Sequence, residues 1–403
     1  MRISIKTFGC RLNYAESAEI AEKLAEAGLE MADDKPDIIV INTCTVTANA
    51  DRRCLNYICK AREKNPKIKI IATGCGVKVF PEKYQGVADD LVEKRNVVSL
   101  INEGATPRRS KSRIQQEYGR TRAFIKIQDG CNNFCAYCIV PYARGREKSV
   151  AAASIISQIK KAEKAGYQEV VLTGVNVSRY QGGLASALEA VLKQTGMPRI
   201  RLGSLHPEVV DQQFLAVVKN PRICPHFHLS LQSGSDRILK IMGRPYTLAD
   251  YQKSIDVLRS ALPDVAISTD LIVGFPGETD RDFADSLRFC RQMGFMKIHV
   301  FPYSRRTGTK AADLPDQIPL VIKKQRSRQA QELSDELRLE YMKRFVGQQV
   351  EVLFESQKGG KWFGYSKNYL PVLLASGDDL LNRIVGGEIG GIEEGRMVMR
   401  NSQ

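Results

Sequence analysis

The sequence has no hydrophobic stretch long enough to cross a membrane, because no run approaches the roughly 18 consecutive apolar residues that a spanning helix needs. Its first ten residues, MRISIKTFGC, also lack the basic segment and apolar core of a secretory signal. The chain nevertheless has ten cysteines among 403 residues. Without an export signal, cysteines serve metal binding or redox chemistry more often than disulfides. We therefore expect a cytoplasmic protein that has no membrane segment.

Three of the cysteines lack a fourth metal ligand nearby. Cys131, Cys135 and Cys138 have the spacing Cys-x3-Cys-x2-Cys in DGCNNFCAYCIVPYARGR, and the nearest histidine along the chain is His206. A structural zinc site needs four protein ligands. Three thiolates on one loop instead favour an iron–sulfur cluster that leaves one iron open, which resembles the signature of radical S-adenosylmethionine enzymes. Buried core thiols are the weaker alternative, since cysteines seldom cluster so densely.

The charge of the chain is unevenly distributed. The net charge is +15, and residues 105–340 hold 36 basic against 23 acidic side chains, whereas residues 1–104 and 341–403 are each close to neutral. Within 105–126 there are seven basic residues and one acidic residue. This concentration favours a polyanion, usually nucleic acid, although a solvated surface of no special purpose is the alternative. The predicted RNA contacts are Arg108, Arg109, Lys111 and Arg113.

The first hundred residues alternate between strand and helix patterns. Strands are expected at 3–8, 37–43 and 68–74, with amphipathic helices at 13–28 and 48–64. This alternation predicts an α/β fold with a parallel sheet. We assign residues 1–104 to this N-terminal domain and residues 105–122 to a basic linker.

Each of the three predicted strands is followed by a cysteine. Cys10, Cys44 and Cys75 lie in TFGC, INTC and ATGC. Since the carboxyl ends of parallel strands meet at one edge of a sheet, these thiols are predicted to form a second metal site. Three buried thiols are the alternative. Core packing is expected for the other four cysteines, which are Cys54, Cys59, Cys224 and Cys290.

Residues 123–340 repeat the strand–helix pattern on a larger scale. Six strands, at 123–128, 169–174, 199–204, 226–231, 265–275 and 297–304, predict a partial (β/α)6 barrel with Cys131 just after the first strand. A long polar helix is expected at 320–344. Beyond it, short strands at 350–356, 361–375 and 396–400 predict a small closed β-barrel over 341–403, a fold that often binds oligonucleotides.

Taken together, these motifs resemble the methylthiotransferase family of radical S-adenosylmethionine enzymes over essentially the whole chain. The N-terminal motifs and the radical loop are similar to those of the family, as are TDLIVGFPGET (269–279) and FPYSRRTGT (301–309), and the last 60 residues resemble its RNA-recognising TRAM domain. The resemblance implies two 4Fe-4S clusters, S-adenosyl-L-methionine as both methyl donor and radical source, and insertion of sulfur into an unactivated carbon. It also implies a low-potential electron donor such as a flavodoxin or ferredoxin. The sulfur donor is not indicated.

Three branches of the family differ in their substrate. One modifies N6-threonylcarbamoyladenosine at position 37 of tRNA, one modifies the isopentenyl derivative there, and one modifies an aspartate of a ribosomal protein. TFGCRLNYAES and YSKNYLPV look most like the first branch, with Arg11 and Leu12 where the others more often have Gln-Met or Pro-Lys. The alternatives are the isopentenyl branch and, in a different class, a non-catalytic iron–sulfur protein that binds RNA or transfers electrons.

Contacts to the cofactor are predicted from strand ends, and no individual catalytic residue is predicted. Tyr137 is a candidate for the adenine, with core filling as the alternative. The other candidates are Thr173, Gly174, Asn176, Gln232 and Ser233. GFPGE (274–278) is interpreted as a tight turn. Trp362, Tyr365 and Tyr369 are candidates for stacking on RNA bases, and barrel core is the alternative for each.

Overall fold

The computed structural model describes residues 1–102 and 121–400. The predicted RNA contacts Arg108, Arg109, Lys111 and Arg113, with most of the predicted linker, lie outside the described residues. None of the described helices is both long and apolar enough to span a membrane.

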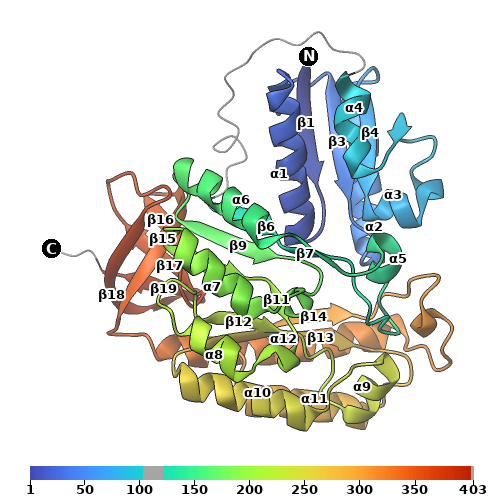
Figure 1. Ribbon diagram of the computed structural model, residues 1–403. Coiled ribbons are helices and arrows are strands. Elements are labelled where there is room, and N and C mark those ends of the chain that lie inside the picture. The colour runs from blue at the N-terminus through green and yellow to red at the C-terminus, as the bar shows by residue number, and fades with distance from the viewer. Residues whose placement is uncertain (103–120, 401–403) are drawn as a thin grey trace.

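Residues 1–102 form the predicted parallel sheet, shown in blue in Figure 1. Its strands run in the order β2-β1-β3-β4-β5 and are β1 (Arg2–Thr7), β2 (Glu30–Met31), β3 (Ile38–Thr43), β4 (Lys69–Gly74) and β5 (Asp90–Leu91). All six residues of the central strand β3 are buried, and a separate apolar cluster packs on each face of the sheet. The helices are α1 (Arg11–Glu26), α2 (Ala48–Lys64), α3 (Cys75–Val79) and α4 (Val97–Asn102).

The central region is the predicted partial barrel. Its parallel strands are β6 (Arg122–Lys126), β9 (Glu169–Thr173), β10 (Arg199–Leu202), β11 (Ser204–Leu205), β12 (His226–Leu229), β13 (Ala266–Val273) and β14 (Lys297–Pro302). They pair as two sheets, in the orders β10-β9-β6 and β11-β12-β13-β14. Only Gly203 separates β10 from β11, so the two sheets continue as one curved wall from β6 to β14 (Figure 1). No pairing joins β6 to β14 among the described residues, and the barrel is therefore open on that side.

Helices cover the outer face of this wall. They are α6 (Ala152–Lys164), α7 (Leu184–Gln194), α8 (Gln212–Val218), α9 (Asp236–Met242), α10 (Leu248–Ala261), α11 (Asp280–Met293) and α12 (Leu320–Lys343), with the short α5 (Val140–Arg144) near the cysteine loop. Strand β12 illustrates the two faces, since Phe227 and Leu229 belong to the apolar core whereas His226 and His228 alternate with them. The concave face of the barrel is thus polar. The short strands β7 (Gln128–Asp129) and β8 (Lys148–Ser149) pair beside it.

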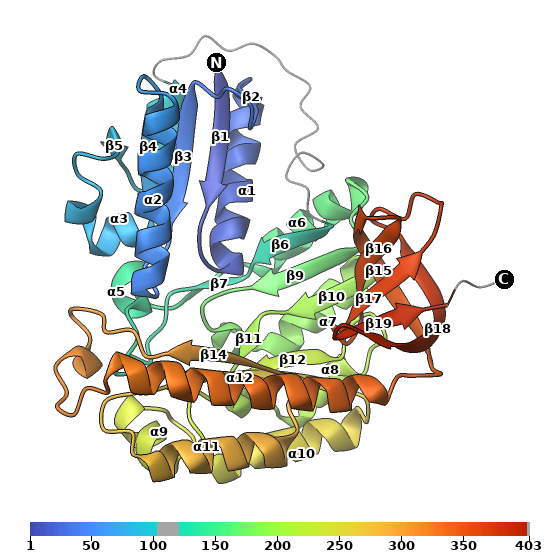
Figure 2. The ribbon, with the colours of Figure 1, turned by 180° about the vertical axis from the view of Figure 1, so that it is seen from behind.

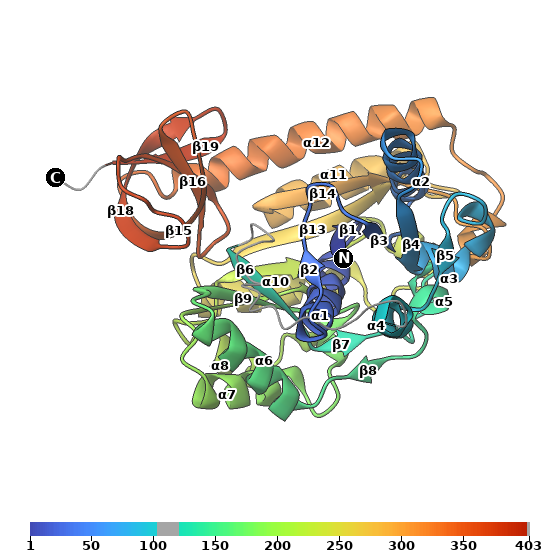
Figure 3. The ribbon, with the colours of Figure 1, turned by 90° about the horizontal axis from the view of Figure 1, so that it is seen from above.

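The C-terminal residues close into the predicted small barrel. Its strands follow the order β15-β16-β17-β19-β18 and are β15 (Gln349–Lys358), β16 (Lys361–Ser366), β17 (Pro371–Ala375), β18 (Ile384–Glu393) and β19 (Arg396–Met399). The expected single strand 361–375 is wrong, because a turn divides it into β16 and β17. Figures 2 and 3 show α12 running along the whole partial barrel into the small barrel. The end of this helix, including Tyr341 and Met342, is part of the small-barrel core.

The N-terminal domain stands over the open side of the partial barrel, as Figure 2 shows from behind. Helix α1 contacts β6, and α3 contacts α5, which follows the cysteine loop. The carboxyl edge of the N-terminal sheet therefore meets the partial barrel beside the radical loop.

Candidate active site

Two glycines bring the three N-terminal cysteines together. Gly9 has a φ of 106°, and a Cβ on it would lie 2.7 Å from the Cβ of Cys44 and 2.8 Å from its Sγ. Gly74, which has a φ of 99°, is pressed equally closely against the backbone of Thr43. Only glycine combines this left-handed backbone with such close approach. The Gly-Cys pairs of TFGC and ATGC thus allow the loops after β1 and β4 to pack on the end of β3.

Side chains then connect the same three loops. Asn13 donates from Nδ2 to the carbonyls of Phe8 (2.7 Å) and Thr43 (3.0 Å), which joins the first loop to the second. The Thr43 hydroxyl donates to the Thr73 carbonyl at 2.6 Å and accepts from the amide of Gly76 at 3.0 Å, which joins the second loop to the third. The cysteine edge is consequently braced on both sides of Cys44.

The radical loop, which contains Cys131, Cys135 and Cys138, lies between β7 and α5. Cys135 is buried, and Cys131 and Cys138 are half-buried. Arg244, which is not among the site residues expected from the sequence, donates from Nη1 to the Sγ of Cys135 at 3.4 Å, and its Nε donates to the Tyr246 hydroxyl at 2.8 Å. A guanidinium held against a cysteine sulfur compensates negative charge on the site.

In each group at least one thiol, Cys44 or Cys138, needs a positive partner in order to ionise. Burial raises the pKa of Cys44 and of Cys138 to about 12, and the neighbouring cysteines of each group contribute in the same direction. No three His, Cys, Asp or Glu side chains of the described residues converge as ligands of one metal ion would. A 4Fe-4S cluster attaches its thiolates to different irons and requires ligands spread around a volume, which suits two sets of three neighbouring thiols.

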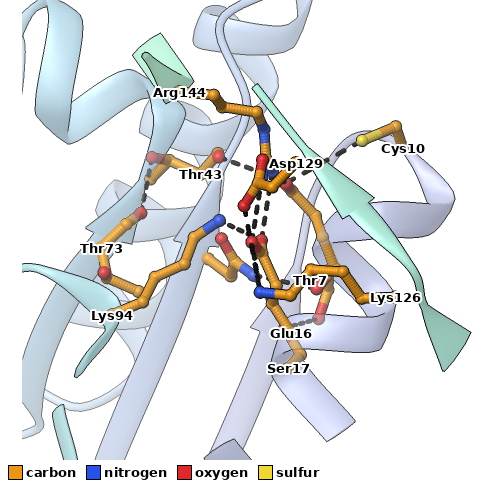
Figure 4. Close-up of polar contacts among 12 residues, drawn as sticks. Thr7, Cys10, Glu16, Ser17, Thr43, Thr73, Lys94, Lys126, Asp129 and Arg144 are labelled. Carbon is orange, nitrogen blue, oxygen red and sulfur yellow. Dashed lines mark hydrogen bonds and ion pairs between the residues drawn. The ribbon is translucent and has the colours of Figure 1, made fainter. Parts of the chain in front are cut away.

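Figure 4 shows the ionic network that joins the two cysteine regions. Arg144, at the end of α5, donates from Nη1 to Glu16 (2.9 Å) and Asp129 (2.9 Å), and from Nη2 to the Oδ1 of Asn13 (2.6 Å). The side chains of Arg144 and Glu16 are each only 6% exposed. Lys94 also pairs with Glu16. The arginine at the end of α5, just after the radical loop, thereby holds Asn13 and Glu16, which follow Cys10.

Acid should release this network. Burial opposes ionisation of Glu16, but the hydrogen bond from Arg144 and the charge of Lys94 outweigh it and lower its pKa from 4.5 to about 2. A carboxylate whose pKa is lower in the folded than in the unfolded protein stabilises the fold at pH values above its unfolded-state pKa. This stabilisation is lost as the pH falls from that value toward 2. The shift corresponds to about 3 kcal/mol. In a thermal unfolding series from pH 6 to pH 2, Glu16→Gln should flatten the loss of stability, and an unchanged pH profile would contradict this assignment.

A second arginine docks the N-terminal domain from the other side. Arg306, in FPYSRRTGT, is 4% exposed and donates to the Thr45 hydroxyl (2.6 Å) and to Asp51 (2.7 Å). The neighbouring Ser304 accepts from the amide of Ala48 at 3.0 Å. Arg144 and Arg306 therefore hold the cysteine edge between them.

The predicted cofactor residues after β9 lie next to the radical loop. A Cβ on Gly174 would lie 2.8 Å from the carbonyl of Gln128, so the two chain segments touch. Thr173 is buried, and Asn176 is buried with neither side-chain Oδ1 nor Nδ2 hydrogen-bonded within the described part of the chain. Buried amides almost always have partners. Asn176 is thus a suitable group for a polar ligand.

The candidates after β12 differ from one another. Gln232 is buried and has a φ of 74°, a strained conformation that clusters at functional sites. Ser233 is fully buried and lies near Ser286, with its hydroxyl accepting from the amide of Ser235. Tyr137 packs at the edge of a small apolar cluster beside the radical loop. The buried hydroxyl of Ser233 thus has hydrogen-bond partners within the protein, and its burial does not require a ligand.

Three other sequence predictions have direct structural outcomes. GFPGE forms the expected turn, in which the Gly274 amide donates to Glu278 at 2.6 Å and Arg326 pairs with the same carboxylate. Trp362 packs in the core of the small barrel. Cys54, Cys224 and Cys290 are buried as expected, but Cys59 is exposed on α2, so its predicted core packing is wrong.

Comparison with known proteins identifies the family. Residues 125–290 match the radical SAM superfamily, and residues 2–93 match a family described as "Uncharacterized protein family UPF0004". The chain is also 37% identical to the threonylcarbamoyladenosine tRNA methylthiotransferase MtaB of Aquifex aeolicus (strain VF5), over 88% of this chain and 92% of the relative. The chain belongs to the methylthiotransferase family.

Other relatives of this methylthiotransferase carry two kinds of name. MtaB of Thermotoga maritima is 36% identical over 91% of this chain and 90% of the relative. A tRNA-2-methylthio-N(6)-dimethylallyladenosine synthase of Clostridium novyi (strain NT) is 37% identical over 88% and 85%. Among solved structures, the radical S-adenosylmethionine methyltransferase TsrM from Kitasatospora setae has a TM-score of 0.60 at 14% identity, covering 77% of each chain, which supports the fold. A radical S-adenosylmethionine enzyme uses that cofactor with a 4Fe-4S cluster.

Proposed function

We propose that this methylthiotransferase converts N6-threonylcarbamoyladenosine at position 37 of tRNA to its 2-methylthio derivative. One observation carries the proposal: two separate groups of three cysteines lie on facing parts of one structure, joined through Arg144. The names of the MtaB relatives support the threonylcarbamoyl branch over the isopentenyl branch. A tRNA substrate supports the expected cytoplasmic location.

The two sets of thiols are suited to two 4Fe-4S clusters, one held by Cys131, Cys135 and Cys138 and the auxiliary one by Cys10, Cys44 and Cys75. When bound, the clusters and S-adenosylmethionine supply the electron, the carbon radical, the methyl group and the site of sulfur attachment. That chemistry suits the C2–H bond of adenine, which is neither acidic nor activated. The electron comes from a low-potential donor such as a flavodoxin or ferredoxin.

The residues of the chain itself bind and orient the reactants. Arg144 and Arg306 fix the distance between the cysteine edge and the radical loop, because each is buried and bonded across the junction. Arg244 lies against Cys135 and compensates charge there. The amide of Asn176, which has no hydrogen-bond partner within the described part of the chain, is assigned to the polar part of S-adenosylmethionine.

The basic segment is assigned to the tRNA backbone. Residues 341–403, which resemble a TRAM domain, have 8 basic and 7 acidic side chains, so bulk charge there contributes little. Charge reversal at Arg108, Arg109 and Lys111 should weaken tRNA binding markedly at low salt, and less so at high salt, because released counterions drive phosphate contacts. A filter-binding salt titration measures this effect. Unchanged affinity would show that other surfaces hold the tRNA.

The branch is tested by nucleoside mass spectrometry of tRNA from a strain that lacks the gene. We expect methylthiolated threonylcarbamoyladenosine to disappear while the methylthiolated isopentenyl form persists. Loss of the isopentenyl form instead would reassign the substrate. Restoration of the missing nucleoside by the wild-type gene, but not by a gene encoding Cys131→Ala, serves as the control.

The non-catalytic alternative makes a different spectroscopic prediction. A cluster with three cysteine ligands keeps one iron accessible, so the spectrum of the anaerobically reconstituted protein should change when S-adenosylmethionine is added. A fully ligated cluster in an electron-transfer or RNA-binding protein would be indifferent to it.

A further inference from the structure

Tyr369 is held in a strained backbone conformation where the three parts of the chain meet. Its φ is 65°, in the left-handed region that bulky residues rarely adopt. The ring stacks on Tyr365 with centroids 4.8 Å apart and lies 5.0 Å from His226, the first residue of β12. Tyr369 therefore projects from the small barrel against the polar face of the partial barrel.

Guanidinium groups surround this ring, and those from the partial barrel are neutralised. Arg201 lies 4.5 Å and Arg122 lies 5.3 Å from the centroid of the Tyr369 ring. Arg201 donates to Glu169 at 2.7 Å and Arg122 donates to the same carboxylate at 2.6 Å. Arg122 also pairs with Glu355 of the small barrel. These two cations have counter-ions within the fold.

Arg11 approaches the same ring from the N-terminal domain, and it has no counter-ion among residues 1–102 and 121–400. Its guanidinium lies 5.6 Å from the Tyr369 centroid, and Nη2 donates to the tyrosine hydroxyl at 3.4 Å. No carboxylate of the residues the structure describes is within ion-pair distance of Arg11, although the side chain is half-buried. A partly buried guanidinium without such a partner is suited to bind an anion, and its planar fork matches the oxygens of a carboxylate or a phosphate.

The charged and titratable groups near Arg11 neither neutralise it nor compete with it for an anion. Asp270, an acid on the polar face, pairs with the Nε2 of His228 at 3.1 Å. Partial burial and His228 lower the pKa of His299 to about 4, and Arg11 contributes in the same direction. His299 is therefore neutral near pH 7 and does not compete for a negative charge.

We propose that Arg11 and the Tyr369 hydroxyl form the subsite that binds the carboxylate of the threonylcarbamoyl group, and so select this substrate. The inference rests on the proposed function. Arg11 directly follows Cys10, and in adenine C2 and C6 flank the single atom N1. A base whose C2 faces the cysteine edge therefore carries its N6 substituent close to Arg11. An isopentenyl group offers no charge at that point.

A phosphate of the tRNA backbone is the other anion that the Arg11 guanidinium can bind, and the test separates the two sources. Three anticodon stem-loops are titrated against the reconstituted protein, carrying at position 37 threonylcarbamoyladenosine, its methyl ester or unmodified adenosine. The wild type should bind the free carboxylate about tenfold to a hundredfold more tightly than the ester, the range of one charge-assisted pair. Arg11→Gln should remove that preference and leave binding of the ester unchanged, whereas Arg11→Lys should keep part of it.

Lys23→Gln is the matched control, since it removes the same charge from the exposed part of α1, where Lys23 pairs with Glu19. Its preference should equal that of the wild type, and the iron content and unfolding temperature of each variant verify that it is loaded and folded. Equal weakening of all three stem-loops by Arg11→Gln would assign Arg11 to a phosphate and overturn the proposal. Retained preference in Arg11→Gln would overturn it as well. A wild type that converts only the isopentenyl substrate would instead refute the proposed function.

Discussion

Replacing the two sets of cysteines should abolish methylthiolation in two different ways. Cys131→Ala should stop both the reductive cleavage of S-adenosylmethionine to methionine and the modification of tRNA. Cys44→Ala should stop the modification of tRNA while leaving cleavage measurable, because Cys44 lies at the centre of the other cysteine edge. Anaerobic assays that quantify methionine and methylthiolated nucleoside in the same reaction separate the two effects.

Iron content and a neutral cysteine control complete this experiment. Each variant should retain about half of the wild-type iron, since each loses one of two equal clusters. Cys59→Ala should behave as the wild type, because Cys59 is exposed on α2 and belongs to neither group of three cysteines. Full iron content in Cys44→Ala, or loss of methionine formation in it, would contradict the assignment of separate sites.

Arg144→Met should cause the largest effect of any substitution outside the cysteines. Among the described residues it leaves buried Glu16 with Lys94 and the partly exposed Lys126 as cationic partners. Removing one partner of a buried pair costs about 3–5 kcal/mol. We expect weaker docking of the N-terminal domain, measured as faster hydrogen exchange in α1 and α5. Methylthiolation should fall steeply while cleavage of S-adenosylmethionine persists.

A double substitution separates charge burial from geometry. The double variant Glu16→Gln/Arg144→Met removes both charges. Its loss of protection from hydrogen exchange in α1 and α5 should therefore be smaller than the sum of the losses in the two single variants. Arg146→Met is the matched control two residues further along the chain, where Arg146 lies over the Phe134 ring 5.2 Å away. Wild-type exchange in α1 for Arg144→Met would show that the network of Figure 4 does not hold the domains.

Local patterns in the sequence were sufficient to predict the three-part architecture. The helix expected at 48–64 matches α2 (Ala48–Lys64), and all six barrel strands were expected where they occur. Strand β18 (Ile384–Glu393) was missed, because its repeated glycines weaken strand propensity and give no apolar alternation. Its pairing with β15 and β19 fixes it as a strand, and that information is non-local.

The site was predictable only as far as its residues carry a chemical signature. Cysteines that follow predicted strands can be recognised as candidate metal ligands from the sequence alone, and the motifs also contain the glycines before Cys10 and Cys75. Arg144 contacts Glu16 across 128 positions, and Arg11 contacts Tyr369 across 358, so neither pair leaves a local signal. All four residues lie within quoted motifs, yet their partners follow only from the docking of domains.

The most direct test of the central claim uses the purified, anaerobically reconstituted protein with a reductant, S-adenosylmethionine and a sulfide source. Two anticodon stem-loops, carrying threonylcarbamoyladenosine or isopentenyladenosine at position 37, are digested after reaction and analysed by mass spectrometry. We predict that the threonylcarbamoyl nucleoside gains one methylthio group and that the isopentenyl nucleoside stays unchanged. Unmodified threonylcarbamoyladenosine, in a reaction that still cleaves S-adenosylmethionine to methionine, would contradict the account.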